Sequence, residues 1–144
     1  MAFEEKGAWV GLIAGIITLV VYSAVVLTRA SASGAPLHQT PYIDAMLWSI
    51  GIGIVVMIVA TIIIAATAGR GGTATDLRDK QISARAEYTS RAFLIMGGVG
   101  ALVLAMFEQP HFYIAHVLYF GFALAAVLET ITRIALYRAG MPQW

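Results

Sequence analysis

Four charged residues border the last two long apolar stretches of the chain. Glu87 and Arg91 precede the third stretch, and Glu129 and Arg133 end the fourth. If the two stretches form an antiparallel helical hairpin around Pro110, Arg91 lies at the depth of Glu129 and Glu87 at the depth of Arg133. Ionisable groups within a membrane are usually paired. The sequence therefore predicts a structural charge clasp, made of these four charged residues, that joins the last two helices.

Two alternatives to this charge clasp follow from the same residues. Glu129 alone could serve as a proton or cation site, because carboxylates inside membrane segments often mark ion pathways. In the other alternative, the rotation of the helices separates the charges and each side chain extends to water. The structural clasp is the favoured interpretation.

A second group of candidate ligands is predicted near the outer ends of the helices. Glu108 and His111 are three residues apart, a spacing that carboxylate and imidazole ligands use on helices, and His116 follows one turn later. Imidazole suits zinc, copper or iron. However, Pro110 places the first two residues in a turn, so polar groups near water are the simpler interpretation. We expect neither a bound metal nor a cofactor.

The chain lacks the motifs of the common enzyme classes. It contains no cysteine, which excludes disulfides, thiolate metal sites and thiol-based redox catalysis. Neither a nucleotide-binding loop nor a nucleophile elbow occurs. The run Gly97–Gly100 is rich in glycine but belongs to an apolar stretch, where close helix packing explains it better than phosphate binding. We expect a protein that is not an enzyme.

Composition places the chain among membrane proteins. Its 144 residues are 60% hydrophobic and only 12% charged, with a mean hydropathy of +0.82. Soluble domains carry about 25% charged residues. We therefore predict an all-α membrane protein with one domain, residues 1–144, and a polar loop over Ala30–Tyr42. The four transmembrane helices are expected at about 8–28, 45–68, 76–107 and 112–138, the third extending into the cytoplasm and the last two forming a tight antiparallel hairpin.

The basic residues predict the orientation of the helices. Eight of the nine lysines and arginines fall on one side of the predicted membrane segments, and Arg29 alone falls on the other. Because positive charge concentrates in cytoplasmic flanks, both termini are expected in the cytoplasm, with the protein in a bacterial inner (plasma) membrane. The net charge of +1 argues against nucleic acid as a partner.

Small residues are predicted to let the helices approach one another. In lipid, helices associate through close packing of small side chains and through interhelical polar contacts. The first helix carries a glycine at every fourth residue, which indicates either internal packing, the favoured interpretation, or a docking stripe. The predicted packing residues are Gly7, Gly11 and Gly15 in the first helix, Gly97 and Ala101 in the third, and Gly121 and Ala125 in the fourth.

Three short motifs resemble those of an uncharacterised family of small four-helix membrane proteins of bacteria and archaea. They are the initial FEEKGAWV, the charged loop before the third helix and the closing ITRIALYRAG. In that family the loop commonly reads Asp-Glu-Arg-Asp. Residues 76–79 of this chain read Asp-Leu-Arg-Asp, so Leu77 stands where the family has its second acidic residue. The resemblance spans essentially the whole chain. It implies a four-helix topology and an association with small helix-turn-helix regulators.

The expected function is association rather than catalysis. We predict an accessory or structural subunit of a membrane complex, or the partner of a cytoplasmic regulator. The bilayer surrounds the protein, and a membrane-protein partner or a homo-oligomer is expected. The alternative is a small oligomeric transporter or ion conduit that uses Glu129 as its coupling carboxylate.

Overall fold

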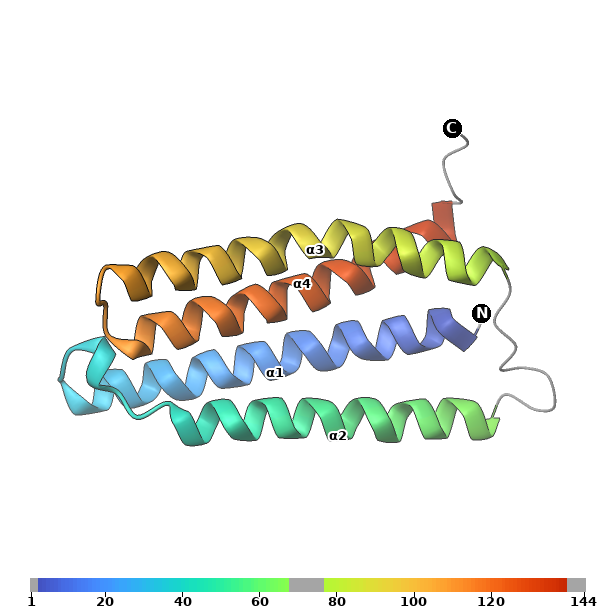
Figure 1. Ribbon diagram of the computed structural model, residues 1–144. Helices are drawn as coiled ribbons and strands as arrows, with labels where there is room; N and C mark the ends of the chain where they lie inside the picture. Colours follow the sequence, from blue (N-terminus) through green and yellow to red (C-terminus); the bar gives the residue numbers. More distant parts are fainter. Residues whose placement is uncertain (1–2, 68–76, 140–144) are drawn as a thin grey trace.

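Four long helices lie side by side in an open row (Figure 1). The computed structural model describes residues 3–67 and 77–139. Its elements are α1 (Phe3–Ser33), the short 3₁₀ helix η1 (Leu37–Gln39), α2 (Ile43–Thr67), α3 (Leu77–Met106) and α4 (His111–Ala139). Helix α4 packs between α3 and α1, and α1 packs between α4 and α2. Because α2 and α3 lie at opposite edges, the helices do not close into a compact bundle.

Each of the four helices is long and apolar enough to cross a membrane. Helix α2 shows this most clearly: none of its most apolar 18-residue window is buried inside the protein. Large side chains such as Trp48 and Ile62 are 70% and 62% exposed. Lipid can cover such a surface without cost, whereas water cannot. The fold is consistent with a multi-pass membrane protein.

The first helix is longer than the sequence pattern predicts. We expected a loop from Ala30, but α1 continues to Ser33, so this part of the prediction is wrong. The helix ends where Gly34 adopts a left-handed conformation with φ of 62°, and Pro36 follows. Ala30–Ser33 contains no helix breaker, and the first residue suited to a left-handed cap is the glycine. The predicted helix limits at residues 68 and 76 lie outside the described residues.

The turn between α3 and α4 is closed by backbone hydrogen bonds. The Gln109 amide donates to the Leu104 carbonyl at 3.0 Å, and the Glu108 amide donates to the Ala105 carbonyl at 3.0 Å. This is the Schellman pattern, with Glu108 at the left-handed position, φ 51°, that glycine usually occupies. Glu108, a candidate metal ligand by sequence, therefore ends α3 through its backbone.

The helices run between two ends of the molecule, the hairpin end and the terminal end. The hairpin end contains the α1–α2 connection, residues 34–42, and the α3–α4 turn, residues 107–110. The terminal end contains the start of α1 and the end of α4. A cluster of buried aromatic and aliphatic side chains holds the hairpin end together: Tyr22, Val26, Tyr42 and Phe112.

Candidate functional site

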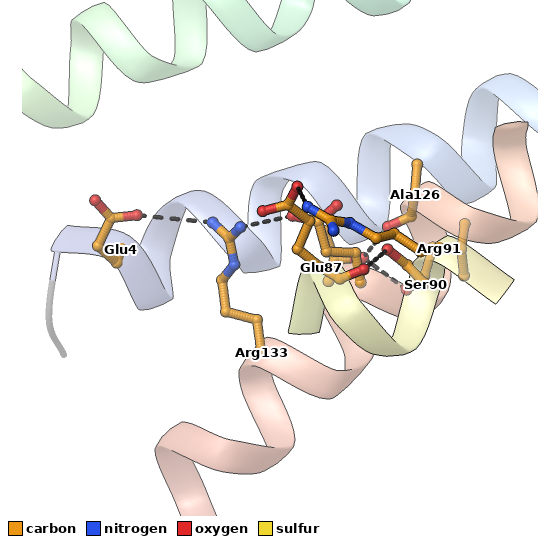
Figure 2. Close-up of polar contacts among 9 residues, drawn as sticks. Glu4, Glu87, Ser90, Arg91, Ala126 and Arg133 are labelled. Carbon is orange, nitrogen blue, oxygen red and sulfur yellow. Dashed lines mark hydrogen bonds and ion pairs between the residues drawn. The ribbon is translucent and has the colours of Figure 1, made fainter. Parts of the chain in front are cut away.

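The four residues of the predicted charge clasp form ion pairs along their own helices (Figure 2). Arg91 pairs with Glu87 at 2.8 Å, and Arg133 pairs with Glu129 at 2.7 Å. The predicted ion pair between Arg91 and Glu129 does not form, so that part of the clasp is wrong. Glu87 and Arg133 interact electrostatically but do not form an ion pair. The charges are therefore joined within each helix rather than between α3 and α4.

The rotation of α3 about its axis explains why Arg91 does not pair with Glu129. Ile82, Ala86 and Ser90 form the buried stripe of α3, with exposures of 0%, 0% and 5%. Glu87 and Arg91 each follow a buried residue by one position, which turns them about 100° away from that stripe. An acidic residue four positions before a basic residue can form an ion pair with it on the same helix, so neither pair requires a second helix.

The interhelical charge contacts of the terminal end join α1 to α4. Arg133 of α4 lies 3.7 Å from Glu4 of α1. Figure 2 marks this contact with a dashed line. Arg138 reaches Glu5 at 4.0 Å and lies over the Trp9 ring at 5.2 Å. The acids lie in the first turn of α1 and Arg138 in the last turn of α4, where each helix dipole favours that charge. Sequence reasoning missed these contacts, because nothing in the sequence indicated that α1 neighbours α4.

A hydrogen bond connects α3 to α4 near the same end. The Tyr137 hydroxyl donates to Asp79 Oδ1 at 2.7 Å. Asp79 lies in the first turn of α3, where a carboxylate is also favoured by the helix dipole. The contact of Asp79 ties the start of α3 to α4.

The small residues of α3 and α4 bring the two backbones into contact. A Cβ atom built on Gly97 would lie 2.9 Å from the Gly121 Cα, and the reverse distance is also 2.9 Å. Ala101 and Ala125 are 5% and 8% exposed. These four residues allow the close approach that membrane helices use in place of a hydrophobic driving force.

The glycines of α1 face different surroundings. A Cβ on Gly11 would meet the Thr130 methyl group at 3.3 Å, and one on Gly15 would meet Val127 at 3.7 Å. These two glycines therefore pack toward α4, as the internal interpretation predicts. A Cβ on Gly7 would meet nothing within 4 Å. The three glycines do not form one continuous packing stripe.

His116 lies inside the aromatic cluster rather than in a metal site. Its Nδ1 is 2.7 Å from the Phe112 carbonyl oxygen, which can only accept, so Nδ1 carries the proton. In the neutral ring, Nε2 then accepts from the Tyr22 hydroxyl at 2.8 Å. The His116 ring also stacks on Phe112, with centroids 3.9 Å apart. Both ring nitrogens are therefore already used.

The other two metal candidates are exposed at the turn. Glu108 and His111 have exposed side chains, whereas His116 is partly buried with the aromatic cluster. Within residues 3–67 and 77–139, no three histidine, aspartate or glutamate side chains gather closely enough to hold a metal ion. The structure therefore does not bring the predicted candidates together.

Tyr22→Phe is expected to destabilise the protein by about 1–3 kcal/mol, because it leaves a nitrogen of His116 without its partner in an enclosed site. Tyr22 itself is only 2% exposed. The measurement is the free energy of unfolding in a mild detergent. Tyr113→Phe is the matched control, since the Tyr113 hydroxyl makes no hydrogen bond to any described residue. Equal losses from both variants would contradict the importance of this hydrogen bond.

A bidentate ion pair fixes the connection between α1 and α2. The Arg29 guanidinium donates to both oxygens of Asp44, at 2.7 and 2.8 Å, and to the Pro41 carbonyl oxygen at 3.0 Å. Paired parallel hydrogen bonds of this kind fix geometry as well as charge. The pair was missed because its two residues are separated by the loop.

A long groove runs between α2 and α4, with α1 as its floor. It has a volume of about 990 Å³ and extends from Ala115 to Thr130 of α4 and from Met46 to Ile58 of α2. Phe122 and Ile54 line it and are 60% and 56% exposed, so its fourth side is open. None of the lining residues is charged. The groove offers space for a ligand or partner.

The polar groups of the groove lie mostly toward the hairpin end. The Tyr119 hydroxyl donates to the Ser49 hydroxyl at 3.1 Å, and Ser49 donates to the Met46 carbonyl oxygen at 2.8 Å. Thr18 also lines the groove, and its hydroxyl makes no hydrogen bond to any described residue. The arrangement supplies hydroxyl groups but no acid, base or metal ligand for catalysis.

Comparison with known proteins adds no relative to this description. The chain matches no family model, no curated protein and no solved structure.

Proposed function

We propose that the protein is a non-enzymatic integral membrane protein that acts by lateral association, as an accessory or structural subunit of a membrane assembly. The observation that carries this proposal is the uncharged groove between α2 and α4. Three helices supply its floor and walls, and the fourth side faces outward. A transmembrane helix placed there would complete a four-helix arrangement that α3, on the far side of α4, leaves open.

The lining of the groove supports a helix as its occupant. Along α2 and α4 the lining residues recur at steps of three and four, which places them on one face of each helix. Small residues, Gly11, Ala14 and Gly15, form part of the floor and add no bulky side chain to it. From Ala115 to Thr130 the groove is about 22 Å long, at 1.5 Å per residue. This length covers most of the roughly 30 Å hydrocarbon core of a bilayer.

We also propose the orientation that the basic residues indicate. Eight of nine lysines and arginines fall on the side of the two termini, and this bias supports a cytoplasmic location of that side in a bacterial plasma membrane. The start of α3 would then extend toward the cytoplasm, where a soluble regulator is a second possible partner.

Transport through Glu129 is less well supported. Its carboxylate accepts a hydrogen bond from Arg133 at 2.7 Å, and Arg133 also contacts Glu4. A carboxylate that couples transport must bind and release a proton or ion, whereas the Glu129 carboxylate is already bound to Arg133. Equal flux through wild type and Glu129→Gln in proteoliposomes, both at background level, would end this alternative.

Photocrosslinking in native membranes tests the association. A benzophenone amino acid at Phe122 would lie in the groove, and one at Met96 of α3 would serve as the control because Met96 is 62% exposed but does not line the groove. We expect a polypeptide adduct from position 122 and none from position 96. Lipid adducts alone at both positions would contradict the proposed function.

A further inference from the structure

We propose that the helix in the groove is α2 of a second copy of this chain, so that two copies form a symmetric dimer with each α2 in the groove of the other. This inference rests on the groove being an association surface, as proposed above. It adds the identity of the partner.

The charge distribution favours α2 among the helices of this chain. The groove lining carries no charge, so a charged side chain inserted there would lose water without gaining a partner. Helix α2 has no charged residue after Asp44, over Ala45–Thr67. Helix α3 carries charges as far as Arg91, and α4 carries them from Glu129. Helix α1 is also uncharged in its middle but is covered by α2 and α4 on both sides.

The position of α2 makes the contact reciprocal. Helix α2 lies at the edge of the row and forms one wall of the groove. A two-fold axis along the membrane normal, placed beside that wall, puts the partner's α2 over α1 and puts this α2 over the partner's α1. Both grooves are filled by one operation, which is the self-complementary arrangement of a closed dimer. Both copies keep the same orientation in the membrane.

Small residues of α2 line the groove beside this axis. Ser49 and Gly53 are four residues apart and both line the groove. This is the small-xxx-small spacing that lets membrane helices approach. A Cβ on Gly53 would meet nothing within 4 Å, whereas one on Gly11 would meet Thr130 and Met57. Gly53 therefore has room for a second helix.

The area of the contact is sufficient for a stable dimer. A helix about 10 Å across and about 22 Å long occupies roughly 1,700 Å³. The groove, with its volume of about 990 Å³, can therefore accommodate a little over half of the volume of such a helix. In the dimer, each α2 is buried in the partner's groove over half of its circumference. The buried halves of the two α2 helices, together with the α1 and α4 surfaces that they cover, amount to roughly 1,100 Å². Biological interfaces bury more than about 1,000 Å².

Two leucine substitutions on the same helix test the dimer. Gly53→Leu fills the groove beside the proposed axis, and Gly51→Leu places the same side chain about 200° around the helix, on the outward face. A Cβ at either glycine meets nothing within 4 Å, so neither substitution creates a clash at the Cβ position within one copy. We expect Gly53→Leu to weaken dimerisation about tenfold or more and Gly51→Leu to leave it unchanged. The measurement is the mass of the particle in mild detergent across a dilution series, with thermal unfolding to verify the fold.

Disulfide crosslinking in native membranes gives a second readout, because the chain has no cysteine of its own. Ile50→Cys lines the groove and is expected to form disulfide-linked dimers, whereas Ile52→Cys, which does not line it, is not. Absence of crosslinked dimers together with adducts of a different polypeptide at position 122 would overturn the second copy and keep the association. A monomer without polypeptide adducts would overturn both proposals. Dimers that Gly53→Leu does not weaken would overturn this interface.

Discussion

Gly97→Ala is expected to destabilise the protein by about 1–3 kcal/mol, a larger loss than most single methyl groups cause. The added Cβ would lie 2.9 Å from the Gly121 Cα, and the obstacle is backbone rather than a flexible side chain. The two helices must therefore move apart, which weakens contacts along the whole α3–α4 interface. The measurement is the free energy of unfolding of the purified protein in mild detergent.

The neighbouring glycine supplies the control for this prediction. A Cβ on Gly98 would meet nothing within 4 Å, so Gly98→Ala changes the same chemistry without the clash. Alanine also favours the helix over glycine by about 1 kcal/mol, so this control is expected to be neutral or stabilising. If Gly97→Ala were as stable as Gly98→Ala, the close approach of α3 and α4 would be wrong.

The reciprocal variant adds a test of the mechanism. Gly121→Ala meets the Gly97 Cα at 2.9 Å, so both substitutions affect the same contact. Once α3 and α4 have moved apart to accommodate the first methyl group, the second methyl group requires less further movement. We therefore expect the double variant to lose less stability than the two single losses combined, as residues that share a contact usually do.

The helices were predictable because their signal is local. Long uncharged runs give four helices whatever their neighbours are. The helix ends were less predictable, since Ala30–Ser33 has no strong preference and the loop actually begins at Gly34, where α1 stops. The Glu108 cap gave no signal at all, because a glutamate in the left-handed conformation is uncommon.

The neighbours of each helix were harder to predict than its limits. In the predicted register Gly97 would lie opposite residue 123, and it contacts Gly121, only two positions away. The depth of the charges was therefore nearly right. Their pairing failed because the rotation of α3 is decided by packing around Ala86 and Ser90, which the positions of the charges do not reveal.

The groove could not be predicted from any one helix. Its lining comes from α1, α2 and α4, and it exists only because α3 packs on the far side of α4. Sequence reasoning named Gly11 and Gly15 as packing residues but could not say which helix they meet. The faces of three separate helices become one feature only when their order in the row is known.

Arg133→Gln is expected to destabilise the protein by roughly 1–3 kcal/mol, below the loss for a fully buried ion pair because its side chain is 21% exposed. The substitution leaves the carboxylates of Glu4 and Glu129 without their cation, and these side chains are only 26% and 31% exposed. The Arg133 Nε atom is buried as well. The start of α1 is then expected to loosen from α4, which limited proteolysis of the detergent-solubilised protein would detect alongside the loss of thermal stability.

The matched control is the equivalent pair on α3. Arg91→Gln also breaks an ion pair between residues four positions apart, but the two side chains are 61% and 57% exposed and form no ion pair with another helix, so a negligible loss is expected. In a double-mutant cycle, Glu4→Gln should recover part of the stability that Arg133→Gln removes, since the unpaired carboxylate disappears. Equal losses from Arg133→Gln and Arg91→Gln would mean that buried Ala8 and the Trp9 ring, rather than Arg133, hold α1 against α4.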